Sequence, residues 1–349
     1  MNPGLAETAD PILSVRALRT QFTTRDGVIT AVRDVSFELR AKQRLGIVGE
    51  SGSGKSALAL SILGLIEPPG RVVSGEVRFR GRDLRALSER ELLRIRGNDI
   101  SLIFQDPMTA LDPIRRVGDQ LVEAIRAHQN VSRSHAWRRG VELLREVEIP
   151  FADRRVNDYP HQYSGGMRQR VMIAIALAND PDVLIADEPT TALDVTTQAQ
   201  ILDLLERLAV ERGAAVILIT HNLGIVADFC DSVQVMYAGR IVESAPLRHL
   251  FSHPVHPYTE ALLKSVPRMG RDKVGPLYSI SGRPPSLASL PRGCAFEPRC
   301  SLGGGRKVCI EDAPPIMEWH TPAGSVMTEC HFGADRFANH ETLLERADG

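Results

Sequence analysis

One short segment, GESGSGKS, has the composition and spacing of a phosphate-binding loop. It satisfies the pattern G-x-x-x-x-G-K-[ST] with Gly49, Glu50, Ser51, Gly52, Ser53, Gly54, Lys55 and Ser56. Glycines let the backbone wrap so that successive N–H groups face an anion where a helix begins. Lys55 supplies a point charge for the outer phosphates, and the Ser56 hydroxyl is a hard oxygen ligand for Mg²⁺. The segment follows an apolar run and precedes a helical pattern, which is the context that this motif requires.

Two adjacent carboxylates could supply the catalytic half of such a site. Asp187 and Glu188 directly follow the apolar run at 183–186. Asp187 is suited to hold Mg²⁺ through water, and Glu188 to accept the proton of an attacking water as a general base. Alone, the pair would fit a charged turn equally well. His221, after the run at 215–220, is a candidate contact for the terminal phosphate, although a lone histidine there is more often surface or core.

Four C-terminal cysteines form a second candidate centre. They lie in a Gly-, Pro- and Arg-rich stretch with little apolar content, where a metal could supply missing stability, and they are Cys294, Cys300, Cys309 and Cys330. Their gaps exceed the C-x₂₋₄-C pairs of structural zinc sites, whereas a [4Fe–4S] cluster tolerates wider loops. An iron–sulfur cluster, zinc and metal-free thiols all remain open. Cys230 stands apart and fits a small core residue.

The elements that position these residues alternate between strands and helices. Short β-branched apolar runs predict strands buried on both faces of a mainly parallel sheet, at 44–48, 100–104, 183–186 and 215–220. Helical patterns follow at 55–66 and 196–212. Looser alternation with Asp-Gly and Ser-Gly turns predicts an antiparallel sheet beside this core, from segments 13–20, 28–39 and 76–80.

Two further regions differ from these in sequence pattern and composition. Between 113 and 159 the pattern is almost purely helical, with 117–128 and 135–147 the clearest helices, which predicts a helical insertion. From about 246 onward Pro, Gly and Cys become frequent, and we expect an irregular C-terminal domain.

Composition excludes several classes of function. The 349 residues carry 42 Lys+Arg against 43 Asp+Glu, so a formal net charge of -1 gives no global positive field for nucleic acid or anionic lipid. No apolar run approaches the roughly 20 residues of a membrane-spanning helix. The N-terminus lacks a basic start followed by an apolar run, so we expect a reducing cytoplasm. An odd number of cysteines, five, argues against a disulfide framework there.

Additional motifs make the chain similar to the ATP-binding subunits of ABC transporters. The segment YSGGMRQR at 163–170 resembles their signature, TALD at 191–194 their D-loop, Gln105 their Q-loop glutamine and His221 their switch histidine. All occur in family order and cover about 13–242. The segments HQYSGGM at 161–167 and HPYT at 256–259 resemble the dipeptide and oligopeptide importers in particular.

The resemblance implies an α/β fold: a P-loop NTPase (RecA-like) parallel-sheet core with an antiparallel β-subdomain. An ATP-binding domain would span 1–245, with an inserted α-helical signature subdomain at about 106–165, and an irregular Cys-rich C-terminal domain would span 246–349. ATP and Mg²⁺ are the implied ligands, with Ser56, Gln105 and Asp187 on Mg²⁺ and a catalytic role for Glu188, His221 and Gln105. The signature residues Ser164, Gly165 and Gly166, together with Asp194, would complete the nucleotide site of a second subunit.

Two ligand assignments depend on the resemblance. Adenine would stack on an aromatic side chain of the N-terminal sheet, for which Phe22 is the candidate and Phe37 fits the core better. Some importers of this type hold an iron–sulfur cluster on C-terminal cysteines, so the resemblance favours a [4Fe–4S] cluster on Cys294, Cys300, Cys309 and Cys330.

The implied function is ATP-driven import of di- or oligopeptides. The chain would pair with a second homologous ATPase subunit and dock on two integral membrane permease subunits, with an extracytoplasmic peptide-binding protein completing the complex. It would be peripheral, on the cytoplasmic face of the inner (plasma) membrane, with no nucleic-acid partner. The alternative is a soluble ABC ATPase acting on nucleic acid or ribosomes. That class needs a long coiled coil or two ATPase modules in one chain, and the sequence pattern has neither.

Overall fold

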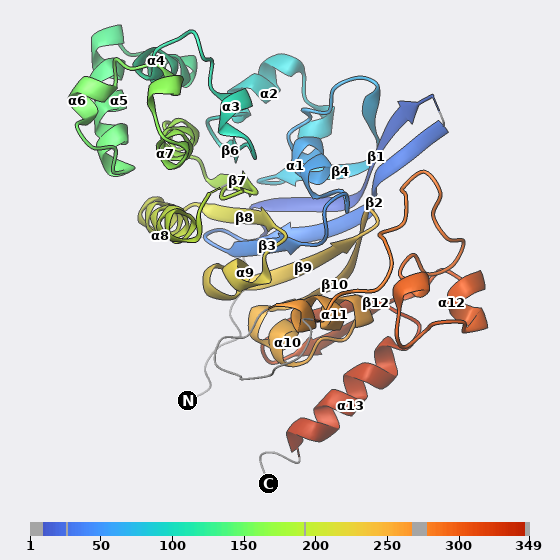
Figure 1. Cartoon of the computed structure of the whole chain (residues 1–349). Coiled ribbons are helices and arrows are strands. Elements are labelled where there is room, and N and C mark those ends of the chain that lie inside the picture. Colours follow the sequence, from blue (N-terminus) through green and yellow to red (C-terminus); the bar gives the residue numbers. More distant parts are fainter. Residues whose placement is uncertain (1–9, 26, 192, 267–277, 346–349) are drawn as a thin grey trace, which may run out of the picture. The chain divides into compact units, whose positions relative to one another are not determined.

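The computed structural model describes residues 10–25, 27–191, 193–266 and 278–345 (Figure 1). The chain divides into two compact units that each draw on several segments. Unit 1 contains Met1–Val15, Phe37–Arg44 and Glu76–Leu218, and unit 2 contains Arg16–Ser36, Leu45–Gly75 and Ile219–Gly349. Each unit is described by itself.

Unit 1 is built around buried parallel strands. Strand β6 (Ile100–Ile103) pairs with β7 (Val183–Asp187), with Ile100 opposite Val183. Strand β8 (Ala215–Thr220) lies next to β7. Every residue of β7 and β8 is buried, as expected of strands covered on both faces. The predicted parallel core is therefore confirmed.

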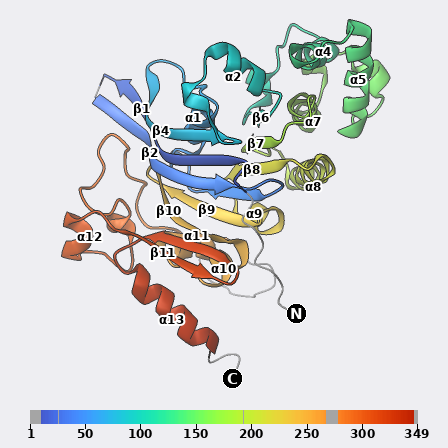
Figure 2. The same cartoon turned by 180° about the vertical axis from the view of Figure 1, so that it is seen from behind.

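Helices make up most of the rest of unit 1. They are α2 (Glu89–Ile95), α3 (Pro107–Ala110), α4 (Val117–His128), α5 (Arg133–Glu146), α6 (Ala152–Arg155), α7 (Gly165–Ala176) and α8 (Val195–Arg212), with 3₁₀ turns at Leu84–Ala86 and Pro160–Gln162. Figure 2 shows α4, α5 and α7 grouped together. Gly140 permits a close approach of α5 to α4, because a Cβ there would lie 3.3 Å from Leu121 Cβ. The predicted helical insertion is present.

The sheet of unit 2 has the strand order β11-β12-β10-β9-β3. Strand β3 (Arg44–Val48) pairs in parallel with β9 (Ser232–Tyr237). The next pairs, to β10 (Arg240–Pro246), β12 (Gly324–Glu329) and β11 (Ile316–Thr321), are antiparallel. The helices of this unit are α1 (Lys55–Ile62), α9 (Leu223–Phe229), α10 (Leu247–Ser252), α11 (Pro257–Ser265), α12 (Lys307–Glu311) and α13 (Gly333–Glu345), with a 3₁₀ turn at Glu297–Arg299.

A second sheet comes from the N-terminal half of the chain. Its strands are β1 (Leu13–Thr24), β2 (Gly27–Leu39), β4 (Gly70–Phe79) and β5 (Arg82–Asp83). In unit 2 the order is β2-β1-β4, and the short link between β1 and β2 makes that pair an antiparallel hairpin. In unit 1 β5 pairs antiparallel with the end of β4. The sequence predicted only the end of β4, because none of its first residues is buried and they therefore lack the apolar alternation of a half-buried strand.

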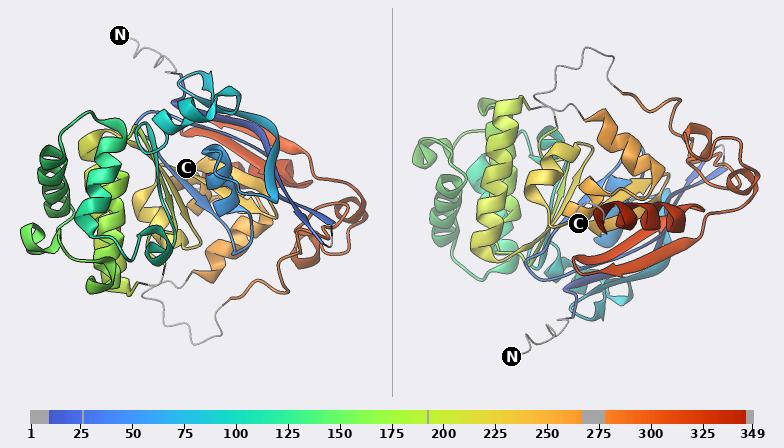
Figure 3. Two further views of the ribbon diagram at one scale, coloured as in Figure 1. Left: turned by 90° about the horizontal axis from the view of Figure 1, so that it is seen from above. Right: turned by 90° about the horizontal axis from the view of Figure 1, so that it is seen from below.

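The C-terminal region contains more regular structure than its Pro, Gly and Cys content predicts. Strand β12 extends the sheet by pairing with β10, and α13 packs on β11 (Figure 3). The rings of Trp319 and Phe337 stack there, with centroids 4.6 Å apart. The strands escaped prediction because each is short and follows a loop-rich stretch. Among the described residues, no helix is long and apolar enough to cross a membrane.

A buried carboxyl group fixes the start of α11. Glu243 on β10 is 0% exposed, and its two oxygens accept hydrogen bonds from the backbone N–H groups of Val255 (2.7 Å) and His256 (2.8 Å). Burial raises the pKa of Glu243 from 4.5 to about 7. Burial also lowers the pKa of His256 to about 3, so that its neutral ring accepts the N–H of Tyr258 through Nδ1. This arrangement orients the HPYT segment.

The raised pKa of Glu243 predicts a pH dependence of stability. Between pH 4.5 and 7 the folded protein keeps a proton that the unfolded chain releases, so stability falls as pH rises. We expect this group to lower the free energy of unfolding by about 1.4 kcal/mol per pH unit across that window. Glu243→Gln should remove this component, and urea unfolding at several pH values measures it. The exposed control Glu67→Gln should keep the wild-type slope, and equal slopes for Glu243→Gln and wild type would contradict the assignment.

Candidate functional site

The phosphate loop, residues 49–56, connects β3 to α1 in unit 2. Two of its glycines are sterically required. A Cβ on Gly49 would lie 2.1 Å from Met236 O, and one on Gly54 would lie 2.2 Å from Ala31 O. Gly54 also has a φ of 105°, in the region that favours glycine. The loop therefore folds only with glycine at these two positions.

Lys55 supplies the cationic group of this loop. Its side chain is buried, and Nζ donates hydrogen bonds to Gly49 O (2.8 Å) and Glu50 O (3.0 Å). The loop is anchored by Gly239 N, which donates to Ser53 O at 2.9 Å. A wrapped backbone at a helix N-terminus, with a buried ammonium group beside it, fits a phosphate chain.

Unit 1 brings together two of the predicted catalytic residues. Gln105 follows β6 and donates from Nε2 to Glu188 Oε2 at 3.1 Å. Glu188 directly follows the buried Asp187 at the end of β7 and has a φ of 46°, which is strained for a non-glycine residue. Thr191 also donates to Glu188 Oε2, at 2.8 Å, through its hydroxyl. We did not predict this contact, although a threonine three residues after the carboxylate was its available signal.

The signature segment, residues 163–170, opens α7 in the same unit. Ser164 is the N-cap of α7 and its Oγ accepts from Met167 N at 3.3 Å. The two glycines that follow face the start of α8: a Cβ on Gly166 would lie 2.7 Å from Thr197 Cγ2, and one on Gly165 would lie 3.6 Å from Leu193. Asp194 is the N-cap of α8, accepting from Thr197 N (2.9 Å). Small residues thus let two helix N-termini approach.

The segment after Gln105 also contacts the signature helix. Arg168 of α7 donates from Nη1 to Met108 Sδ of α3 at 2.7 Å, and from Nε to Pro160 O at 2.9 Å. Met108 is exposed, as is nearby Ile114. Side chains of α3 and of the first turn of α7 are therefore in contact.

Two remaining nucleotide-site predictions lie in unit 2. His221 is exposed and directly follows β8, as the sequence indicated. Phe22 is half-buried on β1, with its ring against Gly70 at the start of β4: a Cβ on Gly70 would lie 2.5 Å from that ring. The roles of His221 at the terminal phosphate and of Phe22 under adenine stay predictions.

The predicted [4Fe–4S] cluster is wrong. Among the described residues, which include all five cysteines, no group of three or more His, Cys, Asp or Glu side chains is arranged to hold a metal ion. The thiols instead pack in the fold: Cys309 and Cys330 are buried, and Gly303 N donates to Cys300 Sγ at 3.2 Å. Burial raises the pKa of Cys294 to about 12, which keeps that group a thiol. The predicted ligand set of Cys294, Cys300, Cys309 and Cys330 is therefore not supported among the described residues.

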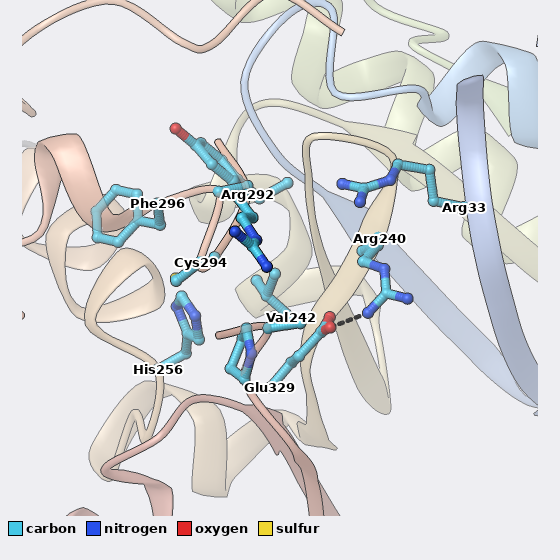
Figure 4. Close-up of a pocket in the computed structure, with 13 residues that line it drawn as sticks. Arg33, Arg240, Val242, His256, Arg292, Cys294, Phe296 and Glu329 are labelled. Atoms are coloured by element: carbon cyan, nitrogen blue, oxygen red, sulfur yellow. Dashed lines mark hydrogen bonds and ion pairs between the residues drawn. The ribbon is translucent and has the colours of Figure 1, made fainter. Parts of the chain in front are cut away.

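A small pocket of about 100 Å³ lies in the C-terminal part of unit 2 (Figure 4). Its lining includes Arg33, Tyr237, Arg240, Arg292, Phe296 and Glu329. Arg240 forms an ion pair with Glu329 inside it, so part of its charge is already balanced. No residue of the phosphate loop lines this pocket, which separates it from the nucleotide site.

Comparisons with known proteins identify both parts of the chain. Residues 32–191 match the family model described as "ABC transporter", and residues 242–306 match "Oligopeptide/dipeptide transporter, C-terminal region". The oligopeptide transport ATP-binding protein OppD of Escherichia coli (strain K12) is 50% identical over 317 residues, covering 91% of this chain and 93% of that protein. The probable peptide ABC transporter ATP-binding protein y4tR of Sinorhizobium fredii is 52% identical over 311 residues, covering 89% and 92%.

Solved structures agree with this assignment. The dimeric structure of MJ0796, a bacterial ABC transporter cassette, matches with a TM-score of 0.61 and 29% identity, over 68% of this chain and 99% of that one. The cbiO1 protein of Clostridium perfringens, part of the ABC transporter complex cbiONQ, matches with a TM-score of 0.59 and 27% identity, over 70% and 91%. The predicted P-loop NTPase fold is confirmed. The chain therefore belongs to the ABC transporter family, as an ATP-binding and ATP-hydrolysing subunit whose C-terminal region is of the oligopeptide/dipeptide transporter type.

Proposed function

We propose that this chain powers the import of dipeptides or oligopeptides through a membrane ABC transporter. The observation that carries the proposal is the match of residues 242–306 to the oligopeptide/dipeptide transporter C-terminal region, because the ATP-binding part alone is common to ABC proteins of many kinds. A relative whose name gives oligopeptide transport is 50% identical over 91% of the chain, a span that includes that region.

The phosphate loop would hold the nucleotide. Lys55 and the loop N–H groups would bind its phosphates, and Ser56, Gln105 and Asp187 would hold Mg²⁺. When bound, Mg²⁺ neutralises phosphate charge and orients the terminal phosphoryl group. Phe22 would stack on adenine.

Glu188 would act as the general base. It would accept the proton of the attacking water, and the Gln105 amide and the Thr191 hydroxyl, both bonded to its Oε2, would hold the carboxylate in position. Its strained backbone supports this role, because such strain concentrates where side-chain placement matters. His221 would contact the terminal phosphate.

The signature segment would act on a partner. Ser164 caps a helix whose first residues are glycines, so the N-terminus of α7 presents backbone N–H groups and a positive dipole to a phosphate. We infer that Ser164, Gly165, Gly166 and Asp194 complete the site of a second homologous ATPase subunit. Loss of the terminal phosphate would then weaken contacts shared by the two subunits.

This chain and the second ATPase subunit would dock on two permease subunits at the cytoplasmic face of the membrane. An extracytoplasmic peptide-binding protein would deliver the peptide to the permease subunits. The α3 helix, joined to α7 through Met108 and Arg168, would carry motion between permease and nucleotide. The alternative, a soluble ABC ATPase acting on nucleic acid or ribosomes, is not favoured, because the matched relatives are peptide transport proteins over about nine-tenths of the chain.

Lys55→Ala should abolish nucleotide binding. The buried ammonium group is the cation of the loop, and its loss leaves the phosphates with backbone N–H groups alone. We expect Mg-ATP affinity to fall by at least about 100-fold in a fluorescent-nucleotide titration. Lys307→Ala, at a side chain 84% exposed on α12, is the matched control and should bind normally. Wild-type affinity in Lys55→Ala would exclude the loop as the phosphate site.

Glu188→Gln should separate binding from turnover. The amide keeps the shape of the side chain but cannot accept a proton, so we expect ATP hydrolysis by the assembled transporter to fall by about 10² to 10⁴ while ATP binding persists. ATP-bound dimers should accumulate in size-exclusion chromatography. Glu211→Gln, on the exposed face of α8, should hydrolyse ATP normally. Hydrolysis by Glu188→Gln at the wild-type rate would remove Glu188 from the base role.

Transport itself can be tested in cells. A strain without this chain should fail to take up a radiolabelled tripeptide, and the wild-type chain should restore uptake, whereas Glu188→Gln should not. Uptake of a labelled free amino acid by another system serves as the control for membrane energisation. Undiminished peptide uptake without the chain, in a strain with no second peptide importer, would refute the proposed cargo class.

A further inference from the structure

The C-terminal region reaches the phosphate loop through a buried ion pair. Arg299, in the 3₁₀ turn before Cys300, donates from Nη1 to Glu50 Oε2 at 2.5 Å and from Nη2 to Glu50 Oε1 at 2.9 Å. The Arg299 side chain is only 4% exposed, and that of Glu50 is 26% exposed. Two parallel hydrogen bonds from one guanidinium define a fixed geometry, which lysine could not reproduce.

Arg299 is itself held from other sides. Its Nε donates to Ser281 O at 3.0 Å, and its guanidinium lies 5.9 Å from the ring centroid of Tyr237. The hydrogen bond to Glu50 raises the pKa of Arg299, so the group is always charged. The guanidinium is thus held in its orientation toward Glu50 by contacts from other residues.

Tyr258 of the HPYT segment holds the backbone of the same loop residue. Its hydroxyl accepts a hydrogen bond from Glu50 N at 2.9 Å, and its side chain is fully buried. The Tyr258 ring packs against Tyr237, with centroids 4.6 Å apart, and against Phe296 at 5.3 Å. Because Glu50 O accepts from Lys55 Nζ, every polar group of Glu50 has a partner, and two of the three are C-terminal.

The charge of Glu50 is the reason that this arrangement matters for function. A carboxylate in the second position of the loop repels the phosphates that the loop must bind, and it could also attract the Lys55 ammonium group away from them. A guanidinium that pairs with the carboxylate bidentately neutralises it and occupies both of its oxygens, as Arg299 does here. Without Arg299, the Glu50 carboxylate would weaken the binding of phosphates by this loop.

We propose that Arg299 is a positioning residue for ATP binding. It neutralises the Glu50 carboxylate and, together with Tyr258, holds the phosphate loop in position from the C-terminal region. The inference rests on ATP binding at residues 49–56. It assigns a role to the HPYT motif and to the arginine beside Cys300 that neither the family resemblance nor the loop motif supplies. If the Arg299–Glu50 ion pair only stabilised the fold, its loss would weaken ATP and AMP binding alike.

Nucleotide titrations of the purified full-length chain test the proposal. We expect Arg299→Gln to bind Mg-ATP about tenfold more weakly than wild type, with a smaller loss for AMP, which carries fewer phosphate charges. The double variant Arg299→Gln, Glu50→Gln should recover to within about twofold of wild type, because the unpaired carboxylate is gone. The loss in Arg299→Gln should also shrink as KCl is raised, since salt screens the repulsion.

Controls separate this proposal from misfolding and from failure of the nucleotide site. Circular dichroism and thermal melting establish that each variant folds, and Arg283→Gln, an exposed arginine of the same segment, should bind Mg-ATP normally. Arg299→Lys keeps the positive charge, so it should lose less Mg-ATP affinity than Arg299→Gln. It replaces Arg299→Gln in the test if that variant does not fold. Lys55→Ala in the same assay reports whether the loop binds nucleotide at all.

Two results would overturn the proposal. Folded Arg299→Gln with wild-type affinity would show that the pair does nothing for the nucleotide. A loss of affinity that Glu50→Gln fails to rescue, and that is equal for ATP and AMP, would assign Arg299 to packing of the C-terminal region alone.

Discussion

The structure depends on one electrostatic constraint: a polyanion must bind to a loop that itself carries a carboxylate. Backbone N–H groups and the Lys55 ammonium group supply the attraction, and Gly49 and Gly54 allow the backbone to present them. Glu50 opposes it, and its charge is matched by the buried Arg299. The electrostatics of the phosphate loop therefore depend in part on a residue of the C-terminal region, far outside the loop motif.

The sequence predicted most of the motifs and strands that are formed by consecutive residues. The phosphate loop binds through successive backbone groups, so its pattern of glycines is sufficient to identify it. Strands β7 and β8 could also be predicted from the sequence, because burial on both faces leaves an unbroken apolar run. Gly165 and Gly166 were assigned by resemblance, and the structure adds a packing reason: they let α7 approach the start of α8.

Contacts between distant segments had no such signal. Arg299 and Glu50 are 249 residues apart, and Gln105 and Glu188 are 83 residues apart. Nothing in the local sequence pattern of either pair indicates that its two side chains meet. The iron–sulfur prediction was wrong for a related reason: cysteine spacing limits how thiols can approach one another but does not determine whether they are arranged to hold a metal ion. In the fold, packing and backbone contacts account for these side chains, as at Cys300, where the sulfur accepts a backbone N–H.

These observations change how the C-terminal region is understood. Glu243 fixes the backbone at His256, His256 orients Tyr258, and Tyr258 binds the N–H of Glu50, so a continuous series of contacts leads from β10 to the nucleotide loop. A loop that shifts on binding ATP must either carry Tyr258 and Arg299 with it or break their hydrogen bonds. Both cost free energy, because both side chains are buried among packed aromatic rings. The region therefore restrains the phosphate loop, although residues 242–306 match a family model separate from that of the ATP-binding part.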